Sequence, residues 1–352
     1  MSKGFEGSTA LVVGGAGFVG SNLSHDLLRK GVASLVIIDN FMSSEPINVP
    51  DDERVIFIFG SAADPRVLQQ LPKHIDFAWH LACYHGNQSS IADPFADHAN
   101  NTLPSLSLFD HLANYTDPQK VVYAAAGCAV AEKTYGGAQA TSEDAPISLF
   151  HDSPYSISKL VGELYGNYFF IRNGLPFVRA RFQNVYGPGE ILGAGQWRRT
   201  PHTLWRNVIP TFMWRAMNNM PLELDGGGDT SRDFIFVQDI VVGLEALALQ
   251  GCPGEAYNLA SGIETDIWTL ANLIIETVDS DSDLLLRPAR AWDRSGNRFG
   301  STQKSHEELG FQALTGLSDG LGLTATWMEQ HRETIETCIA RYARLGKQGP
   351  LN

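Results

Sequence analysis

The stretch TALVVGGAGFVGSNLSHDLLRKG, residues 9–31, decides the fold of this 352-residue chain. An apolar run leads into closely spaced glycines, and apolar residues then recur at the intervals of a helix. The pattern predicts a buried strand, a tight turn and a helix. Gly14 permits the turn, Gly17 lets the backbone approach a bound phosphate group closely, and Gly20 lets the helix pack on the strand.

The start of the predicted helix indicates what the turn binds. Backbone N–H groups in the first turn of a helix have no helical partner, so Phe18 and Val19 lie where such groups can bind a pyrophosphate. The run SLVIIDN, residues 34–40, is a second buried strand that ends in Asp39 and is followed by Asn40. A carboxylate there accepts hydrogen bonds from an adenosine ribose and repels a 2′-phosphate. The sequence therefore predicts a dinucleotide site that prefers NAD to NADP.

Further strands follow at the spacing of alternating strand and helix units, over residues 54–60, 77–82, 120–126 and 177–187. We therefore expect an α/β fold, a Rossmann-type doubly wound parallel sheet, with ligands at the carboxyl ends of its strands. Residues at or after the ends of these strands become candidates for contact with the cofactor: Gly60, Ser61, Leu81, Ala82, Cys83 and, further along the chain, Asn101.

Composition limits the classes of function. The net charge of -13 argues against a general nucleic-acid-binding protein, because such proteins need a basic face. No run of about eighteen apolar residues and no N-terminal signal pattern appears, so we expect no membrane association. The four cysteines, at positions 83, 128, 252 and 338, show neither metal-ligand spacing nor a disulfide framework. We expect a cytoplasmic chain that binds no metal.

The stretch SPYSISKLVGELYGNYF, residues 153–169, carries the candidate chemistry. Tyr155 and Lys159 are four residues apart and so share one face of a helix. A lysine ammonium near a phenol favours the phenolate and lowers the pKa of the phenol from about 10. Tyr155 is thus a candidate general base for a sugar or alcohol hydroxyl, with NAD as the hydride acceptor.

With these features the chain resembles the extended short-chain dehydrogenases that act on nucleotide sugars, the NAD-dependent nucleotide-sugar epimerase and dehydratase family. The resemblance covers almost the whole chain. It rests on eight motifs in order: GGAGFVGSNL (14–23), HLA (80–82), YSISK (155–159), RFQNVYGPG (181–189), NVIPTF (207–212), LDGGGDTSRDFIFVQDI (224–240), YNLASG (257–262) and KSHEELGF (304–311).

The resemblance implies two domains and a partner. An NAD-binding Rossmann domain would span residues 1–187 and include the helix that carries Tyr155 and Lys159. A smaller α/β lobe, mainly residues 188–352, would close over a nucleoside-diphosphate sugar, while segments around 233–257 return to the Rossmann domain. The resemblance also implies a homodimer.

Several residues are implied as contacts of the sugar nucleotide: Asn184, Asn207, Val208, Arg232 and Arg294. The two arginines would clamp the diphosphate, and guanidinium groups suit a dianionic ligand in so acidic a chain. A structural ion pair with Asp229 or Asp233 is the alternative for Arg232. His85, which follows the strand at 77–82, is placed to line the sugar from the opposite side.

The strand KVVYAAA, residues 120–126, departs from the family pattern. In relatives it usually ends in Ser or Thr residues, the last of which hydrogen-bonds the reacting sugar hydroxyl and can relay its proton. Here Ala124, Ala125 and Ala126 stand there, so the usual catalytic hydroxyl is absent at position 126. Three interpretations are open: Tyr155 contacts the sugar hydroxyl directly, the chain is an impaired variant that traps substrate, or it is a non-catalytic protein that binds NAD and nucleotide sugars.

The residues after the alanines narrow the reaction. Relatives that dehydrate the sugar carry an Asp-Glu pair there and relatives that decarboxylate a uronate carry a glutamate, whereas this chain has Gly127 and Cys128. Elimination without an acid to protonate the leaving hydroxyl would be slow. Epimerisation at C4 needs only hydride removal, rotation of the 4-keto sugar and hydride return, so it is the favoured reaction. A net oxidoreductase that releases NADH is an alternative.

Cys128 keeps another reaction open. It is in register with the cysteine that GDP-mannose 3,5-epimerases use to move protons beside a transient ketone. Those enzymes also use a lysine in the loop after Tyr-Gly-Pro, where this chain has Arg198, Arg199, His202 and Arg206 but no lysine. A buried, inert thiol is the alternative for Cys128. The loop is interpreted either as a lid whose arginines bind phosphate or a sugar carboxylate, or as a solvated surface loop.

Overall fold

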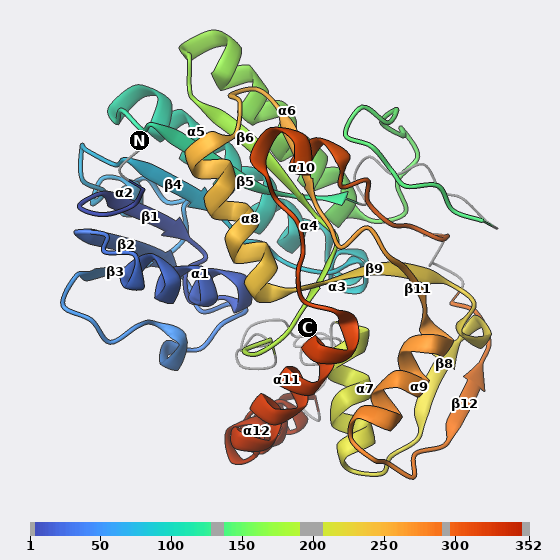
Figure 1. Cartoon of the computed structure of the whole chain (residues 1–352). Coiled ribbons are helices and arrows are strands. Elements are labelled where there is room, and N and C mark those ends of the chain that lie inside the picture. The colour runs from blue at the N-terminus through green and yellow to red at the C-terminus, as the bar shows by residue number, and fades with distance from the viewer. Residues whose placement is uncertain (1–3, 128–136, 191–206, 291–295, 347–352) are drawn as a thin grey trace.

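The computed structural model describes residues 4–127, 137–190, 207–290 and 296–346, with side chains as far as residue 340 (Figure 1). The strands are β1 (Thr9–Val13), β2 (Ser34–Asp39), β3 (Val55–Phe59), β4 (Phe77–His80), β5 (Lys120–Ala126), β6 (Phe177–Phe182), β7 (Asn184–Tyr186), β8 (Leu222–Asp225), β9 (Ser231–Phe236), β10 (Ala256–Leu259), β11 (Glu264–Asp266) and β12 (Leu284–Arg287). The helices are α1 (Phe18–Arg29), α2 (Pro65–Leu68), α3 (Asn87–Ala92), α4 (Pro94–Asp97), α5 (Leu103–Tyr115), α6 (Pro154–Asn173), α7 (Val208–Met217), α8 (Val237–Gln250), α9 (Ile267–Thr277), α10 (Gln303–Leu309), α11 (Leu317–Gln330) and α12 (Arg332–Gly346). Short 3₁₀ helices lie at η1 (Pro46–Asn48) and η4 (Gly226–Gly228), and a π-helical segment at η2 (His98–Thr102).

The main sheet has seven strands in the order β10-β6-β5-β4-β1-β2-β3. Every neighbouring pair in it is parallel. In register, Val13 of β1 lies opposite Ile38 of β2 and His80 of β4, so the carboxyl ends of these strands form one edge. The order reverses at β1, with β2 on one side and β4 on the other, which creates the crevice where such sheets bind ligands. The predicted Rossmann-type fold is confirmed.

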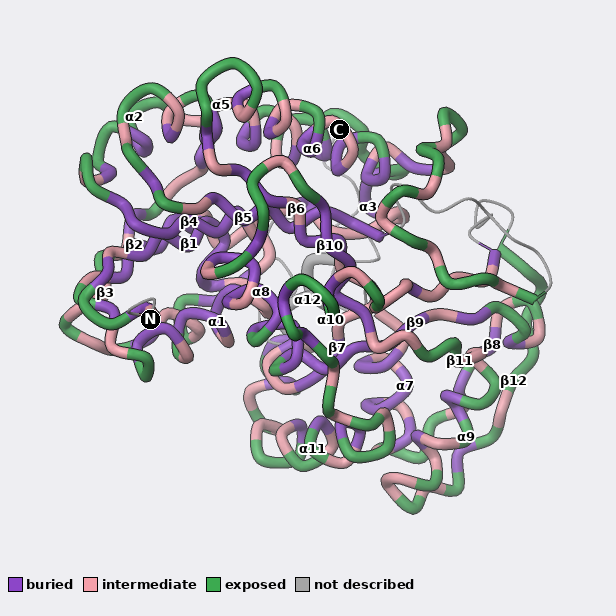
Figure 2. Tube along the Cα trace, turned by 45° about the horizontal axis from the view of Figure 1, so that its top comes forward, coloured by how far each residue is buried: buried purple, intermediate pink, exposed green. Residues whose placement is uncertain are grey.

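Helices cover both faces of this sheet. Successive side chains along each strand point to opposite faces, and both faces are apolar. Leu23 and Leu27 of α1 pack with Leu244 of α8 against one face. On the other face, Phe109 of α5 and Phe169 of α6 share a core with the opposite side chains of the same strands. Figure 2 shows the result: buried residues concentrate along the sheet, while the outer surfaces of the helices are exposed.

Smaller sheets build the second lobe. One has the order β11-β9-β7 and the other pairs β12 with β8. Their core joins Phe212 of α7, Phe234 of β9, Ile274 of α9 and Leu321 of α11. Strand β9 bridges the lobes, since Ile235 packs in the core of the main sheet instead.

The expected single strand over 177–187 is wrong in detail. It stops at Phe182 in the main sheet, and β7 then pairs with β9 in the second lobe. Gln183 and Asn184 therefore lie where the chain passes from the main sheet to the second lobe. Later, α8 and β10 lie on the main sheet, so the chain crosses between lobes more than once. The domain boundary at residue 187 stays a prediction.

Within the described residues, no helix combines the length and apolar character needed to cross a membrane. Cys83, Cys252 and Cys338 form no disulfide in this part of the chain. The same residues contain no cluster of three or more His, Cys, Asp or Glu side chains suited to a metal ion.

Candidate active site

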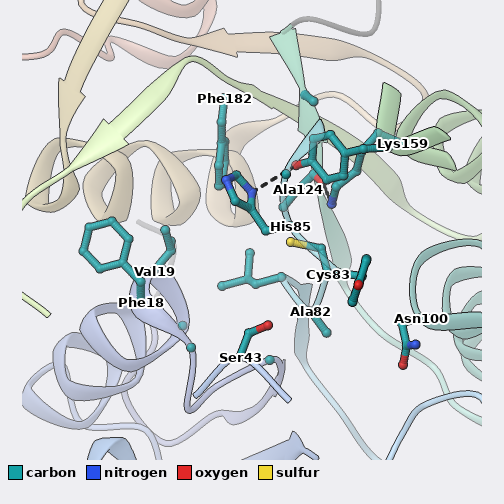
Figure 3. Close-up of a pocket in the computed structure, with 18 of the residues that line it drawn as sticks. Phe18, Val19, Ser43, Ala82, Cys83, His85, Asn100, Ala124, Lys159 and Phe182 are labelled. Atoms are coloured by element: carbon teal, nitrogen blue, oxygen red, sulfur yellow. Dashed lines mark hydrogen bonds between the residues drawn. The ribbon is translucent and has the colours of Figure 1, made fainter. Parts of the chain in front are cut away.

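A cleft of about 390 Å³ opens at the carboxyl edge of the main sheet, beside the second lobe (Figure 3). The ends of β1, β2, β4 and β5 contribute to its wall. Many of the predicted site residues line it: Gly14, Gly17, Phe18, Val19, Asp39, Asn40, Gly60, Ser61, Leu81, Ala82, Cys83, His85, Ala126, Tyr155, Lys159, Asn184, Asn207 and Arg232. The fold therefore brings together candidates for both the cofactor and the sugar nucleotide.

The glycine turn after β1 forms a cradle that larger residues cannot make. Gly14 has a φ of +87°, and a Cβ there would lie 2.5 Å from the backbone nitrogen of Ala82. A Cβ on Gly20 would lie 2.0 Å from the carbonyl oxygen of Gly14, so α1 packs directly on the turn. Gly17 is the N-cap of α1 and adds no capping side chain of its own. This cradle and helix N-terminus fit the pyrophosphate of a dinucleotide.

Asp39 ends β2 at the same edge of the sheet. Its Oδ2 accepts a hydrogen bond from the backbone N–H of Ala16 at 3.1 Å, which ties it to the glycine turn. Its Oδ1 accepts from the N–H of Phe41 and the hydroxyl of Ser44, at 2.9 and 2.7 Å. Burial raises the pKa of the Asp39 carboxyl above its ordinary value, although these donors oppose the shift. Asp39 thus organises the loop after β2, and its predicted contact with a ribose stays a prediction.

The helix that carries Tyr155 is fixed at its N-terminus. Ser153 caps α6 by accepting a hydrogen bond from the N–H of Ser156, and Pro154 follows the cap as the first helical residue. One turn later, the Nζ of Lys159 donates to the carbonyl oxygen of Ala124 at 2.7 Å. This bond ties α6 to the end of β5, so the buried side chains of Tyr155 and Lys159 face the cleft.

The alanines form an apolar wall beside this pair. Ala124, Ala125 and Ala126 are buried and all line the cleft, so no side-chain hydroxyl extends from this end of β5. Instead, the hydroxyl of Tyr155 lies 3.4 Å from Nδ1 of His85. Figure 3 shows His85 in the cleft, with a dashed line that marks its hydrogen bond.

A second interaction holds the other side of the imidazole. Nε2 of His85 lies 3.4 Å from Oδ1 of Asn207, the N-cap residue of α7. Nδ2 of Asn207 in turn donates to Oε1 of Glu190, a buried carboxylate that also lines the cleft. Sequence reasoning missed Glu190, which follows the GPG turn at 187–189, because one carboxylate among 39 acidic residues carries no distinguishing signal.

Arg232 lies on the cleft wall contributed by β9. Its Nη1 donates to the carbonyl oxygens of Ser231 and Gly296, at 2.6 and 2.7 Å. Asp233, one alternative partner considered for Arg232, accepts hydrogen bonds from Ser261 and from the backbone of Gly262. These two backbone carbonyls orient the guanidinium of Arg232 on the wall of the cleft.

Two predicted residues do not line the cleft. Asn101 lies behind the wall, where its Oδ1 accepts from the N–H of Tyr84 at 2.7 Å and its Nδ2 donates to Asp97. It therefore holds the loop that carries His85, and its neighbour Asn100 lines the cleft instead. Val208 begins α7 and packs on the core of the second lobe. Four further candidates lie outside the described residues: Cys128, Arg198, Arg199 and Arg294.

Comparison with known proteins agrees with this arrangement. The sequence matches the NAD dependent epimerase/dehydratase family over residues 10–260. It is similar to the Bordetella bronchiseptica enzyme WbmF, whose crystal structure in complex with NAD+ and UDP shows 46% identity and a TM-score of 0.88, covering 99% of this chain and 100% of that one. A UDP-glucose 4-epimerase from Mycolicibacterium smegmatis is 28% identical over 89% of this chain and 96% of its own length.

A dTDP-glucose 4,6-dehydratase from Streptomyces antibioticus is 26% identical over 95% of this chain and 96% of its own length. Curated relatives of this chain thus include both epimerases and dehydratases of nucleotide sugars. The predicted family and the predicted cofactor are both confirmed by these matches. The chain therefore belongs to the NAD-dependent epimerase/dehydratase family, and its cofactor is NAD.

Proposed function

We propose that this chain epimerises a nucleoside-diphosphate sugar at C4 through a transient 4-keto sugar. The observation that carries the proposal is that Tyr155 and Lys159 line the same cleft as the glycine turn at Gly14 and Gly17. A general base and a dinucleotide cradle in one cleft are what reversible oxidation of a sugar hydroxyl requires. NAD, when bound there, supplies the acceptor for a hydride from the sugar carbon and returns it to the opposite face of the ketone.

The residues around the cleft have distinct tasks in this proposal. Tyr155 takes the proton from the sugar hydroxyl, and Lys159 places a positive charge beside the phenol on the same helix face. Arg232, oriented by backbone carbonyls, binds the diphosphate. The apolar wall of Ala125 and Ala126 offers no acid to a leaving hydroxyl, which supports epimerisation over dehydration. The relatives include a 4-epimerase, so the proposed reaction is one that this family carries out.

The test is to incubate the purified protein with UDP-, GDP-, CDP- and dTDP-sugars and to identify products by NMR. We expect one C4 epimer pair to interconvert, with a transient rise in NADH absorbance and no net NADH. Inversion at C3 or C5 would contradict the proposed carbon and favour the Cys128 chemistry. Stoichiometric NADH would indicate a net oxidoreductase. Thermal stabilisation by a sugar nucleotide without any product would indicate a non-catalytic binding protein.

We also infer that the chain forms a homodimer through α6. Four apolar side chains recur along one face of this helix and are at least half exposed: Ile157, Leu164, Tyr168 and Ile171. Their spacing makes a continuous stripe, which a second copy of the same helix would bury. Analytical ultracentrifugation should give a dimer for the natural protein and a monomer for Leu164→Glu. A natural protein that sediments as a monomer would contradict this inference.

A further inference from the structure

His85 lies next to the hydroxyl of Tyr155, the proposed base. Its Nδ1 is 3.4 Å from the hydroxyl of Tyr155, and the two rings meet edge to face with centroids 5.5 Å apart (Figure 3). Catalytic hydrogen bonds are often long before substrate binds and shorten in the reacting complex. In relatives a Ser or Thr hydroxyl stands near this tyrosine, but here the corresponding wall is Ala126.

The neighbours of His85 fix which nitrogen carries the proton. The carboxylate of Glu190 accepts from Nδ2 of Asn207, so the amide of Asn207 presents its oxygen to the imidazole. An amide oxygen can only accept, so Nε2 of His85 is the donor. In the neutral imidazole Nδ1 is then the acceptor, and it faces the hydroxyl of Tyr155. All three bonds run in one direction, from Tyr155 through His85 and Asn207 to Glu190.

We propose that His85 is the proton acceptor of Tyr155 and replaces the hydroxyl that Ala126 lacks. This inference rests on the proposed function. During oxidation the O–H bond of the sugar breaks and a new O–H bond forms on Tyr155, while the original proton of Tyr155 passes to Nδ1 of His85. The sugar carbon loses its hydride to NAD+ and becomes a ketone, so the sugar alcohol, NAD+ and neutral imidazole give ketone, NADH and imidazolium. Return of the hydride reverses each transfer.

The charges around His85 are compatible with both forms of the imidazole. Apart from the tyrosines and His85 itself, the ionisable groups that line the cleft within the described residues are Asp39, Cys83, Lys159, Glu190, Arg232, Arg290 and Arg298. Glu190 connects to the imidazole through Asn207 and favours the imidazolium as it forms, while the cations favour its return to the neutral state. His80, the last residue of β4, is fully buried. Its burial, with a smaller contribution from the charge of Lys159, lowers its pKa to about 3. His80 therefore stays neutral and is not a competing acceptor.

The experiment compares His85→Asn and His85→Gln with the natural protein. Gln can reach Asn207 but has no basic nitrogen, so it separates positioning from proton transfer. We expect both variants to bind NAD normally and to lose about a hundredfold in kcat with little change in KM. Because the neutral imidazole is the acceptor, kcat of the natural protein should fall as the pH drops through the pKa of a histidine, about 6.5 when unperturbed. Both variants should lose that limb of the profile.

Controls and a measurement without substrate sharpen the result. His98→Asn changes an exposed histidine of η2 and should leave kcat and its pH profile unchanged. Imidazole added to His85→Ala should restore part of the lost rate, which a structural role would not predict. In the protein without added sugar, histidine 15N NMR should show the His85 signal, identified by its loss in His85→Asn, as the Nε2–H tautomer.

The outcomes are separable. The inference would be overturned if the natural protein turns over its substrate and both variants match its kcat and its pH profile. The proposed epimerase would then remain intact. An Nδ1–H tautomer would also overturn it, whatever the variants do. A natural protein that neither turns over any nucleotide sugar nor forms transient NADH would overturn the proposed function and this inference together.

Discussion

The two ends of the cleft are built in different ways. The cofactor end is made by one continuous unit, in which β1, the turn at Gly14 and helix α1 follow each other in sequence and shape the site with backbone atoms. The proposed sugar end is assembled from His85, Tyr155, Glu190 and Asn207, which come from separate segments and meet through side chains. The cofactor end is a feature of the fold, whereas the sugar end is where chains of the same fold can differ in chemistry.

The largest effect should come from the sugar end. Tyr155→Phe removes the proposed base but keeps the ring that packs on His85. We expect kcat to fall by about 10² to 10⁴-fold while NAD affinity, measured by calorimetry, stays the same. The control Tyr115→Phe alters an exposed tyrosine at the end of α5 and should turn over at the natural rate. Turnover of Tyr155→Phe within tenfold of the natural protein would show that Tyr155 is not the base.

The cofactor end should instead respond to changes in backbone packing. A Cβ on Gly20 would lie 2.0 Å from the carbonyl oxygen of Gly14, and backbone cannot move aside as a side chain can. Gly20→Ala should therefore lower the free energy of unfolding by about 1–3 kcal/mol and weaken NAD binding by at least about tenfold. Thermal denaturation with and without NAD measures both quantities.

A second helical glycine provides the control for that change. Gly322 lies within α11, where an added Cβ would meet nothing within 4 Å. Gly322→Ala should raise stability by about 0.5–1 kcal/mol through helix propensity, with NAD affinity unchanged. Equal effects at Gly20 and Gly322 would contradict the packing argument for the cofactor end.

This difference explains what could be predicted from the sequence. The roles of Gly14 and Gly20 follow from local spacing, because a strand, a tight turn and a helix impose them without help from the rest of the chain. Tyr155 and Lys159 could be paired from the sequence for the same reason, because residues four positions apart lie on one face of a helix. The parallel sheet followed from the repeated strand and helix units.

The parts that sequence reasoning missed depend on distant contacts. Glu190 and Asn207 lie in separate segments, and nothing in the sequence of either segment predicts that they meet. Their hydrogen bond, and its link to His85, appeared only in the structure. Asn101 was predicted to contact the cofactor, whereas it holds the backbone of Tyr84, because strand spacing does not show which way a side chain in the following helical segment η2 faces. The strand over 177–187 was predicted too long because the extended chain continues past Phe182, while its partner changes from β5 to β9.

A smaller effect is expected at Asp39, where the cofactor end does depend on a side chain. Asp39→Ala removes an acceptor and a negative charge near the predicted ribose position, so the preference for NAD over NADP should fall by about tenfold. It also removes the acceptor for Phe41, whose φ of +55° is strained, so the loop after β2 should loosen. Asp39→Asn keeps an oxygen for Phe41 and should change the cofactor preference with less loss of stability. An unchanged preference in both variants would contradict a ribose contact.

The smallest effect should come from restoring the family hydroxyl. Ala126 is buried in the wall of the cleft that Tyr155 and His85 also line, and Ala126→Ser adds one hydroxyl to that wall. If His85 already accepts the proton of Tyr155, the added hydroxyl is redundant, and kcat should change by less than about tenfold. In a His85→Asn background the hydroxyl is no longer redundant, so Ala126→Ser should raise kcat by about tenfold over that variant alone. A gain in kcat well above tenfold from Ala126→Ser in the natural chain would mean instead that the protein is an enzyme impaired by the absence of this hydroxyl. Equal effects in both backgrounds would show that the serine and the histidine act independently, because two groups that share one proton cannot be additive.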